Sequence, residues 1–294
     1  MQLSCKGTTL EVEDHGSPGG EPLVLIMGLG MQLVAWPAGL VASLVARGFR
    51  VICFDNRDIG LSQSFDHLGT PNVTMQALKF AFGFPVASAY SLTDMAGDTL
   101  GLLDALGIAR AHVCGASMGG MIAQRLAAHH PGRVKSLTLM MTTTGSRRLP
   151  GPTTKVRGAL LSRPGDPSDT ASVVAHYVRL YTLIGSPGYP SSDADLTERM
   201  GRAVRRSYRP RGSARQLIAI AADGSRAKLV AGIKAPTQVI HGSDDPLVPV
   251  ASGRDLAARI AGAELDVIAG MGHDLPAALW PRFVAGIASA AGRA

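Results

Sequence analysis

The feature that most constrains the fold of this chain is the alternation of short apolar segments with amphipathic ones. Runs of apolar and β-branched residues, typical of buried strands, occur at 22–28 (PLVLIMG), 49–55 (FRVICFD), 111–116 (AHVCGA) and 136–142 (SLTLMMT). Segments with helical spacing separate them. Strands that alternate with helices pair in parallel, and helices then cover both faces of the sheet. The sequence therefore predicts an α/β protein with a mostly parallel central sheet.

The segments between the predicted strands carry helix signals. Residues 33–48 have helical spacing and end in a glycine, as expected of a helix C-terminus. Residues 91–107 begin with Ser91 and Asp94 at the spacing of a capping box and also end in a glycine. Residues 121–130 (MIAQRLAAHH) continue the helical pattern directly after a predicted strand. We expect a helix in each of these three segments.

The strand pattern is interrupted between residues 144 and 228. This stretch contains helical segments at 172–185 and 193–208, separated by breaks rich in Pro and Gly. Strand patterns return at 237–242 (TQVIHG) and 263–270 (AELDVIAG), and a last helix is expected at 277–291.

The interruption predicts how the domain is divided. A single α/β core would consist of residues 1–143 and 229–294, and residues 144–228 would form a helical lid inserted into it. The content of 46% hydrophobic and 17% charged residues suits a globular chain of this length with a large core.

The net charge of +7 raises nucleic acid as a partner, but the distribution of charge argues against it. Residues 144–228 hold 15 Lys and Arg against 6 Asp and Glu, whereas the rest of the chain holds 14 against 16. The basic excess therefore belongs to the expected lid. No apolar run is long enough to cross a membrane, and the first residues do not resemble a signal peptide, so a cytoplasmic protein is expected.

Ser117 lies in a G-x-S-x-G motif between a predicted strand and a predicted helix. A chain with 35 Gly in 294 residues produces about 0.3 such matches by composition alone, so the context must carry the argument. A serine in a sharp strand-to-helix turn projects its hydroxyl above the sheet edge, with glycines where side chains would clash. The helix N-terminus that follows would favour an oxyanion. The alternative is an ordinary turn serine.

A serine hydroxyl needs a base and an acid to become a nucleophile at neutral pH. Asp244 and Asp245 follow the predicted strand 237–242, and His273 follows the next one. The order Ser, Asp, His is that of a triad at the carboxyl edge of an open α/β sheet. The residues alone leave Asp244 and Asp245 as alternatives for the acid.

Together these motifs closely resemble the α/β-hydrolase family, and especially its branch of aclacinomycin methylesterase-like enzymes and related actinobacterial carboxylesterases. The resemblance covers nearly the whole chain and is carried by the segments LVLIMGLG, FDNRDIGLS, GASMGG, HGSDDPLVP and GMGHDLP. It implies the α/β-hydrolase fold with a helical lid insertion. It also selects Asp245 as the acid and His273 as the base.

The resemblance further implies an oxyanion hole formed by the backbone N–H groups of Leu29 and Met118. Many relatives have His-Gly where this chain has Met27-Gly28, but the hole uses backbone groups, so the change should not remove it. Asp55, Arg57 and Asp58 in FDNRDIGLS are expected to brace a loop rather than to react. No metal and no organic cofactor is expected.

The predicted function is a serine hydrolase that cleaves a small-molecule carboxylic ester through an acyl-enzyme, with a bulky or a methyl ester as the suggested substrate. A lactonase, a C–C bond hydrolase and a cofactor-free perhydrolase or haloperoxidase are alternatives that share the triad. A non-catalytic ligand-binding protein of the same fold is an alternative of another class. Only turnover of a substrate distinguishes an enzyme from such a binding protein.

Two features of the lid invite a functional interpretation. Tyr177 and Tyr181 lie four residues apart on one helix face, and they are predicted either to line the acyl or alcohol pocket or to pack within the lid. The second is an arc of arginines on the helix 193–208 and just beyond it: Arg199, Arg202, Arg205, Arg206 and Arg209. A solvated basic face is the favoured interpretation of the arc, and attraction to an anionic interface or an acidic substrate is the alternative.

Overall fold

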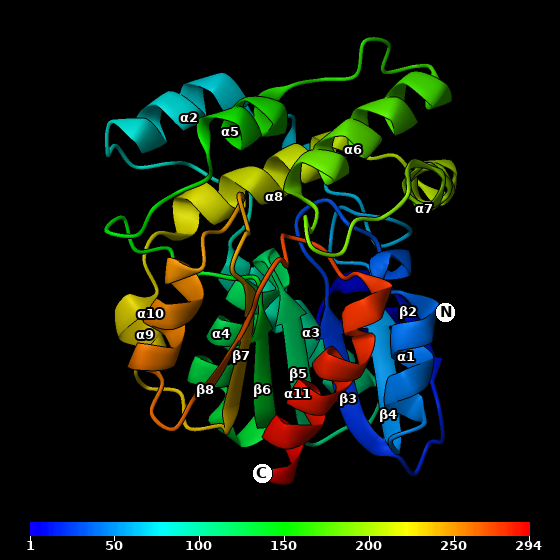
Figure 1. The fold of residues 1–294 in the computed structure, drawn as a ribbon, viewed down its shortest axis with the longest axis vertical. Coiled ribbons are helices and arrows are strands. Elements are labelled where there is room, and N and C mark those ends of the chain that lie inside the picture. The colour runs from blue at the N-terminus through cyan, green and yellow to red at the C-terminus, as the bar shows by residue number, and fades with distance from the viewer.

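The computed structural model describes residues 1–294, and its centre is one eight-stranded sheet (Figure 1). The strand order is β1-β2-β4-β3-β5-β6-β7-β8, with β1, β2 and β4 paired antiparallel and all later pairs parallel. The predicted α/β-hydrolase fold with a mostly parallel sheet is confirmed. The strands are β1 (Gln2–Cys5), β2 (Thr8–His15), β3 (Glu21–Ile26), β4 (Phe49–Phe54), β5 (Ala111–Ala116), β6 (Val134–Met140), β7 (Thr237–Gly242) and β8 (Glu264–Ile268).

The strands β1 and β2 form a hairpin at one edge that the sequence interpretation missed. In β2 the residues Thr8, Leu10 and Val12 are buried and alternate with more exposed ones, which is the pattern of an antiparallel strand with one wet face. The six other strands agree with the predicted segments to within two residues at each end.

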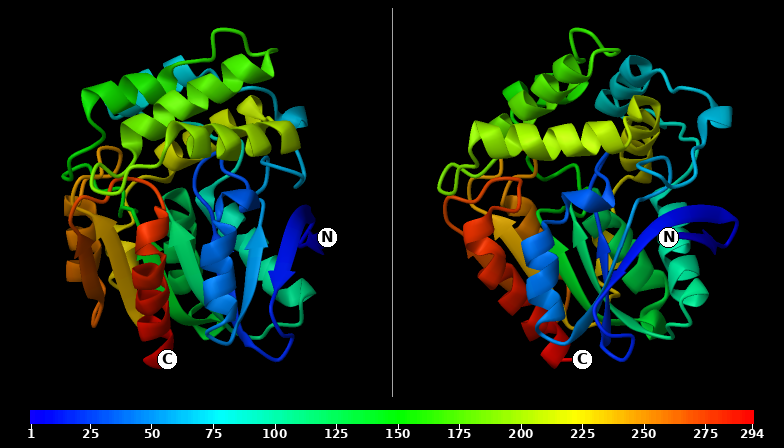
Figure 2. Two further views of the ribbon diagram at one scale, coloured as in Figure 1. Left: turned by 45° about the vertical axis from the view of Figure 1, so that its right-hand side comes forward. Right: turned by 90° about the vertical axis from the view of Figure 1, so that its right-hand side faces the viewer.

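Helices cover both faces of the sheet and bury two separate apolar cores (Figures 1 and 2). The helices α1 (Ala38–Val45) and α11 (Trp280–Gly292) pack on one face. The opposite face is covered by α3 (Leu92–Ala105), α4 (Met118–His129), α9 (Ala227–Val230) and α10 (Ala251–Arg259). Burial on both faces explains why the central strands are continuous apolar runs.

The helix expected at 33–48 is divided in the structure. Residues Leu33–Ala35 form a 3₁₀ turn, and α1 begins only after Pro37, its N-cap. Proline has no N–H to donate and clashes with the preceding turn of a helix, so a helix does not continue through it. The single helix predicted here was wrong in this respect.

The capping box expected at Ser91 is present at the start of α3. Ser91 Oγ accepts from the N–H of Asp94 at 3.1 Å, and Asp94 Oδ2 accepts from the N–H of Ser91 at 2.7 Å. Two N–H groups that would otherwise lack partners are thereby satisfied.

A layer of helices, here called the cap, lies over the carboxyl ends of the parallel strands (Figures 1 and 2). Its helices are α2 (Val73–Ala81), α5 (Thr154–Leu161), α6 (Thr170–Ile184), α7 (Asp193–Arg206) and α8 (Pro210–Asp223). Four of them lie inside the predicted lid segment 144–228. The fifth, α2, comes from the first part of the chain and packs against α8. The helix α9 crosses the predicted boundary at 228 and packs on α4.

None of the helices combines the length and the apolar character that a lipid bilayer crossing would need.

The arginine arc of the lid is not simply a solvated face, which corrects the interpretation made from the sequence. Arg206 Nη1 donates to Asp55 Oδ2 and to Gln32 Oε1, both at 2.7 Å. Arg209 Nη1 donates to the carbonyl of Ser62 at 2.7 Å. Helical spacing placed these residues on one arc but did not reveal that acidic and carbonyl groups of the core face one end of it. These arginines anchor the cap to the core.

A second anchor is the buried pair of Arg215 on α8 and Asp58. The guanidinium donates through Nε and Nη2 to the two oxygens of Asp58 at 2.8 and 2.7 Å, and the side chains are 1% and 0% exposed. Hydrogen bonding to Asp58 also raises the pKa of Arg215, so the charge is retained. Breaking a bidentate buried pair leaves one charge without a partner.

We expect Arg215→Leu to lower the free energy of unfolding by about 3–5 kcal/mol, because Asp58 is then buried alone. Chemical denaturation measures this loss. The matched control is Arg211→Leu on the same helix, whose side chain is exposed and should change stability by less than about 0.5 kcal/mol. Equal stability of the two variants would show that the pair does not hold the cap in place.

Candidate active site

Ser117 occupies a sharp turn between β5 and α4. Its φ and ψ are +54° and −119°, a conformation that a residue with a side chain rarely adopts. The turn is held by hydrogen bonds from Ser117 N to the carbonyl of Met140 and from Thr142 Oγ1 to the carbonyl of Ser117, at 2.9 and 2.7 Å. The strained serine turn expected from the G-x-S-x-G motif is therefore present.

The glycines around Ser117 have the steric role expected of them. A Cβ on Gly119 would lie 2.0 Å from the carbonyl oxygen of Ile26, and one on Gly115 would lie 2.3 Å from that of Gly119. Backbone atoms cannot move far enough to make room for a side chain at either position. The glycines therefore allow α4 to start against β3 and leave the serine as the first side chain above the strand.

The loop after β3 lies beside this turn. A Cβ on Gly28 would come within 3.2 Å of Ser117 Cβ. The N–H of Leu29 has no acceptor within the protein, whereas the N–H of Gly30 donates to Gln216 Oε1 at 2.9 Å. Met118 is the first residue of α4, and the first N–H groups of a helix have no partner within it. Unpaired backbone donors thus lie on both sides of Ser117.

Asp245 and His273 follow β7 and β8 and are in direct contact. His273 Nδ1 donates to Asp245 Oδ2 at 2.7 Å, and both residues are buried. The other carboxylate oxygen accepts from the N–H groups of Leu247 and Val248, at 2.9 and 2.8 Å. These bonds fix the carboxylate and leave Nε2 of the imidazole unprotonated when the ring is neutral.

The neighbouring Asp244 does not contact the histidine. It is exposed, and its Oδ2 accepts from Ser243 Oγ and from the N–H of Gly270. Of the two aspartates that the residue pattern left open, the structure therefore brings only Asp245 to His273.

The Ser117 hydroxyl is not hydrogen-bonded to the imidazole. Its Oγ makes no hydrogen bond within the protein, and Ser117 is half-buried. The geometry thus consists of an assembled Asp–His pair and a separate strained serine at the same edge of the sheet. Catalytic hydrogen bonds are often long without substrate and shorten when it binds.

The loop of His273 is attached to the cap, a relation that the sequence interpretation missed. The N–H of His273 donates to the carbonyl of Ile184 at 2.7 Å, and that of Gly272 donates to Ser186 Oγ at 2.9 Å. Ser186 also donates to Asp274, and burial raises the pKa of this carboxyl group. The end of α6 therefore fixes the backbone that carries the imidazole.

His241 lies beside the pair, with Nε2 3.7 Å from Asp245 Oδ2. Its Nε2 donates to the carbonyl of Val248 at 2.7 Å, and its Nδ1 is buried without a partner. Burial lowers the pKa of His241 and also that of His112. Both imidazoles are therefore neutral in the folded protein at neutral pH.

We expect stability to fall as the pH drops below about 6.5, the ordinary pKa of histidine. There the unfolded chain binds protons at His241 and His112 that the folded chain excludes, so unfolding is favoured at lower pH. Thermal melts between pH 7.5 and 5.5 measure this. His241→Gln keeps a donor for Val248 and should remove part of the slope. An unchanged slope in His241→Gln would contradict the assignment to this residue.

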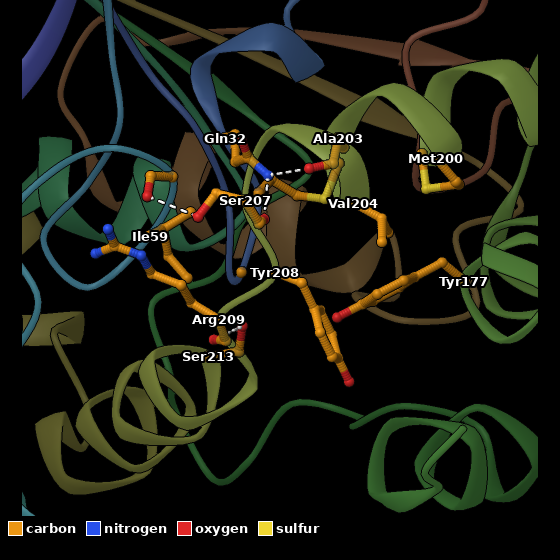
Figure 3. Close-up of a pocket in the computed structure, with 13 residues that line it drawn as sticks. Gln32, Ile59, Tyr177, Met200, Ala203, Val204, Ser207, Tyr208, Arg209 and Ser213 are labelled. Atoms are coloured by element: carbon orange, nitrogen blue, oxygen red, sulfur yellow. Dashed lines mark hydrogen bonds between the residues drawn. The ribbon is translucent and has the colours of Figure 1, made fainter. Parts of the chain in front are cut away.

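A pocket opens between the loop after β3 and the cap (Figure 3). It is small, with a cavity volume of about 40 Å³, and is lined by residues that include Gly30, Met31 and Gln32. Tyr177 from α6 and Tyr208 point toward one another across it, edge to face, with ring centroids 6.4 Å apart. Gly30, the residue after Leu29, is part of the pocket wall.

The two tyrosines singled out from the sequence have different positions. Tyr177 lines the pocket, whereas Tyr181 does not and donates its hydroxyl to the sulfur of Met31, which does. Tyr208, which the sequence interpretation did not select, takes the place opposite Tyr177. Its position after the end of α7 gave no periodic signal.

The polar residues of FDNRDIGLS brace the loop, as expected. Asp55 accepts from the N–H groups of Leu33 and Leu61 at 2.6 and 2.9 Å. Arg57 pairs with the buried Asp98 through Nε at 2.6 Å. None of their charged groups lines the pocket.

Comparison with known proteins agrees with this fold. A family profile described as alpha/beta hydrolase fold matches residues 21–276. The chain is 30% identical to rhodomycin D methylesterase from Streptomyces sp. (strain C5), over 95% of this chain and 93% of that one. It is 30% identical to a putative carbamate hydrolase from Variovorax paradoxus, over 90% and 89%.

A solved structure shows the same fold. The enol-lactonase from Burkholderia xenovorans LB400 superposes with a TM-score of 0.74 at 24% identity and covers 99% of both chains. The resemblance to methylesterases expected from the motifs is confirmed by the sequence relatives. The chain belongs to the α/β hydrolase fold family.

Proposed function

We propose that the protein is a serine hydrolase that cleaves carboxylic esters through an acyl-enzyme. The observation that carries this proposal is the buried Asp245–His273 pair, which lies beyond the same sheet edge as the strained turn of Ser117. An imidazole held by a carboxylate, with Nε2 free, is the base that a serine nucleophile requires. The methylesterase relative supports hydrolysis of an ester.

In the first half-reaction Ser117 Oγ attacks the ester carbonyl carbon, and His273 Nε2 takes the hydroxyl proton. Asp245 keeps the imidazole in the required tautomer and stabilises the imidazolium that forms. The C–O bond to the alcohol then breaks, and His273 returns the proton to the leaving alkoxide. The products are the free alcohol and an acyl group on Ser117.

In the second half-reaction a water molecule gives its proton to His273 and attacks the acyl carbon. The proton passes to Ser117 Oγ as the acyl bond breaks, which releases the carboxylic acid and restores the serine. No redox partner is needed in either half.

The oxyanion of each tetrahedral intermediate would be held by the N–H groups of Leu29 and Met118. Their support is positional: Leu29 N–H has no acceptor in the protein, and Met118 begins a helix whose positive end faces the turn. Gln216 on α8 fixes the loop by accepting from Gly30 N and donating to the carbonyl of Arg57, both at 2.9 Å.

The proposed substrate is a methyl ester or another ester of a bulky acid. Gly30, which follows Leu29 in the chain, lines the pocket together with Tyr177 and Tyr208, and aromatic walls suit an apolar acid group. The relative from Streptomyces sp. (strain C5) is named a methylesterase of rhodomycin D, which supports a methyl ester as the substrate class.

We expect Tyr177→Ala, alone and with Tyr181→Ala, to change the ratio of kcat/KM for small esters to kcat/KM for bulky esters by about tenfold. The reason is that the substrate loses one aromatic contact or gains space in the pocket. A panel of methyl and p-nitrophenyl esters that varies acid and alcohol size measures the shift. Tyr189→Ala is the control, because Tyr189 does not line the pocket. Unchanged specificity in the double variant would remove these tyrosines from the substrate site.

The same panel tests the function itself. Release of acid and alcohol in equal amounts supports the proposal, and γ-lactones, carbamates and peracetate formation with peroxide test the related reactions of this fold. Stoichiometric ligand binding without any product would favour a binding protein and contradict the proposal.

A further inference from the structure

The outer end of the cap exposes a concentration of large apolar side chains. Phe80, Phe82 and Phe84 are 44%, 76% and 63% exposed, and Met75 and Leu78 on α2 are about half exposed. Single exposed apolar side chains are common on monomers, but a contiguous group marks a surface that contacts something else. The segment 80–85 (FAFGFP) is called the Phe tip below.

The Phe tip has a defined position at the end of α2. Gly83 turns the chain with a φ of +80°, which favours glycine, and so separates Phe82 from Phe84 by a tight turn. Arg147 donates to the carbonyl of Phe80 and stacks its guanidinium over the ring, 5.0 Å from the centroid. The tip is thus joined to the beginning of the cap, and α2 and α5 lie on the side turned away from the sheet (Figures 1 and 2).

The charged residues in the two segments that form this part of the cap are basic, up to the exposed Asp166 that follows them. Residues 70–91 and 144–165, which form this part of the cap, contain six Lys and Arg and no Asp or Glu. Five of the six side chains are exposed: Arg147, Arg148, Lys155, Arg157 and Arg163. The paired arginines of α7 and α8 do not belong to this group.

We propose that the Phe tip and its basic surroundings bind the surface of an anionic lipid bilayer. Phenylalanines enter the boundary between headgroups and acyl chains, and nearby Lys and Arg are attracted to anionic headgroups. A second copy of the chain fits less well, because its equivalent surface would bring like charges together. Binding to a nucleic acid would explain the basic side chains and the phenyl rings, but not the exposed aliphatic side chains of Met75 and Leu78 beside them.

Cosedimentation of the full chain with vesicles tests the proposal. Binding is expected with phosphatidylcholine–phosphatidylglycerol vesicles, with weakening at high salt, and much less with phosphatidylcholine alone. Phe82→Ser with Phe84→Ser should lower the partition coefficient by about tenfold or more, since both rings leave the lipid. Arg148→Glu with Arg157→Glu should weaken binding to the anionic vesicles alone.

The matched control is Leu265→Ser on β8, which is 37% exposed at the other end of the sheet and should bind as the wild type does. All three variants change exposed residues, so unchanged melting temperatures are expected. Vesicle binding that is absent in the wild type, or equal in the Phe82/Phe84 variant, overturns the proposal. A dimer seen by light scattering in the wild type but not in the Phe82/Phe84 variant would also overturn it. So would a wild type that binds oligonucleotides but not vesicles, if the same variant no longer binds the oligonucleotides.

Discussion

Replacing Ser117 with alanine is expected to lower kcat for ester hydrolysis by about 10⁶-fold, the size seen when a serine nucleophile is removed from such a triad. The hydroxyl is the only group at this strained turn that can form the acyl bond. Alanine meets the same backbone constraint as serine, so the fold should be kept. Initial rates with a p-nitrophenyl ester, beside a thermal melt, measure both quantities.

Ser213→Ala is the matched control for this prediction. Ser213 also lies beside the loop after β3, with Oγ next to Gly30, and lines the pocket. Its loss should change kcat by less than about tenfold, as a binding contact would. Activity retained by Ser117→Ala, or lost only in Ser213→Ala, would assign the reaction to another group.

Replacing Asp245 with asparagine is expected to lower kcat by about 10⁴-fold, because the amide no longer holds the imidazole in the tautomer that leaves Nε2 unprotonated. The fold should change little, since the side-chain oxygen can still accept from Leu247 and Val248. Steady-state kinetics with the same ester measure the loss.

Asp244→Asn provides a sharp comparison, because it is the adjacent residue with the same chemistry. Asp244 is exposed and contacts Ser243 and Gly270 but not the imidazole, so its kcat should stay close to that of the wild type. Equal losses in the two variants would mean that charge at this loop, rather than the contact with His273, supports the reaction.

The parts of the site that the sequence predicted are those fixed by local chemistry. A few neighbouring residues are enough to recognise a serine between close-packed glycines. The same holds for an aspartate and a histidine that each follow a strand. Parallel strands then bring the three loops to one edge, so the fold converts local motifs into proximity. The order of the three residues along the chain suggested a triad, and the family resemblance selected Asp245 rather than Asp244.

The contacts that the sequence did not predict are those between distant segments. Arg206 and Asp55 are 151 residues apart, and nothing in the helical spacing of α7 shows which core group it meets. Gln216 and Ser186, which fix the loops beside Ser117 and His273, carry no periodic or motif signal. Only the packing of the cap on the core gives them a role.

The helix α2 is missing from the predicted lid for a similar reason. It lies far from residues 144–228 in sequence, and the exposed Phe80 at its end, with Phe82 and Phe84 just beyond it, resembles a core segment in an apolar pattern. Pro37 is a different case, because its effect on the helix predicted at 33–48 follows from the residue itself.

If Ser117 carries the acyl group, a fluorophosphonate should label this residue. The reagent forms a stable adduct only with a serine activated by its base, and mass spectrometry locates it. We expect one adduct per chain on Ser117, loss of esterase activity in proportion, and much slower labelling in His273→Ala. An adduct on another residue that abolishes activity, or full activity without labelling, would contradict it.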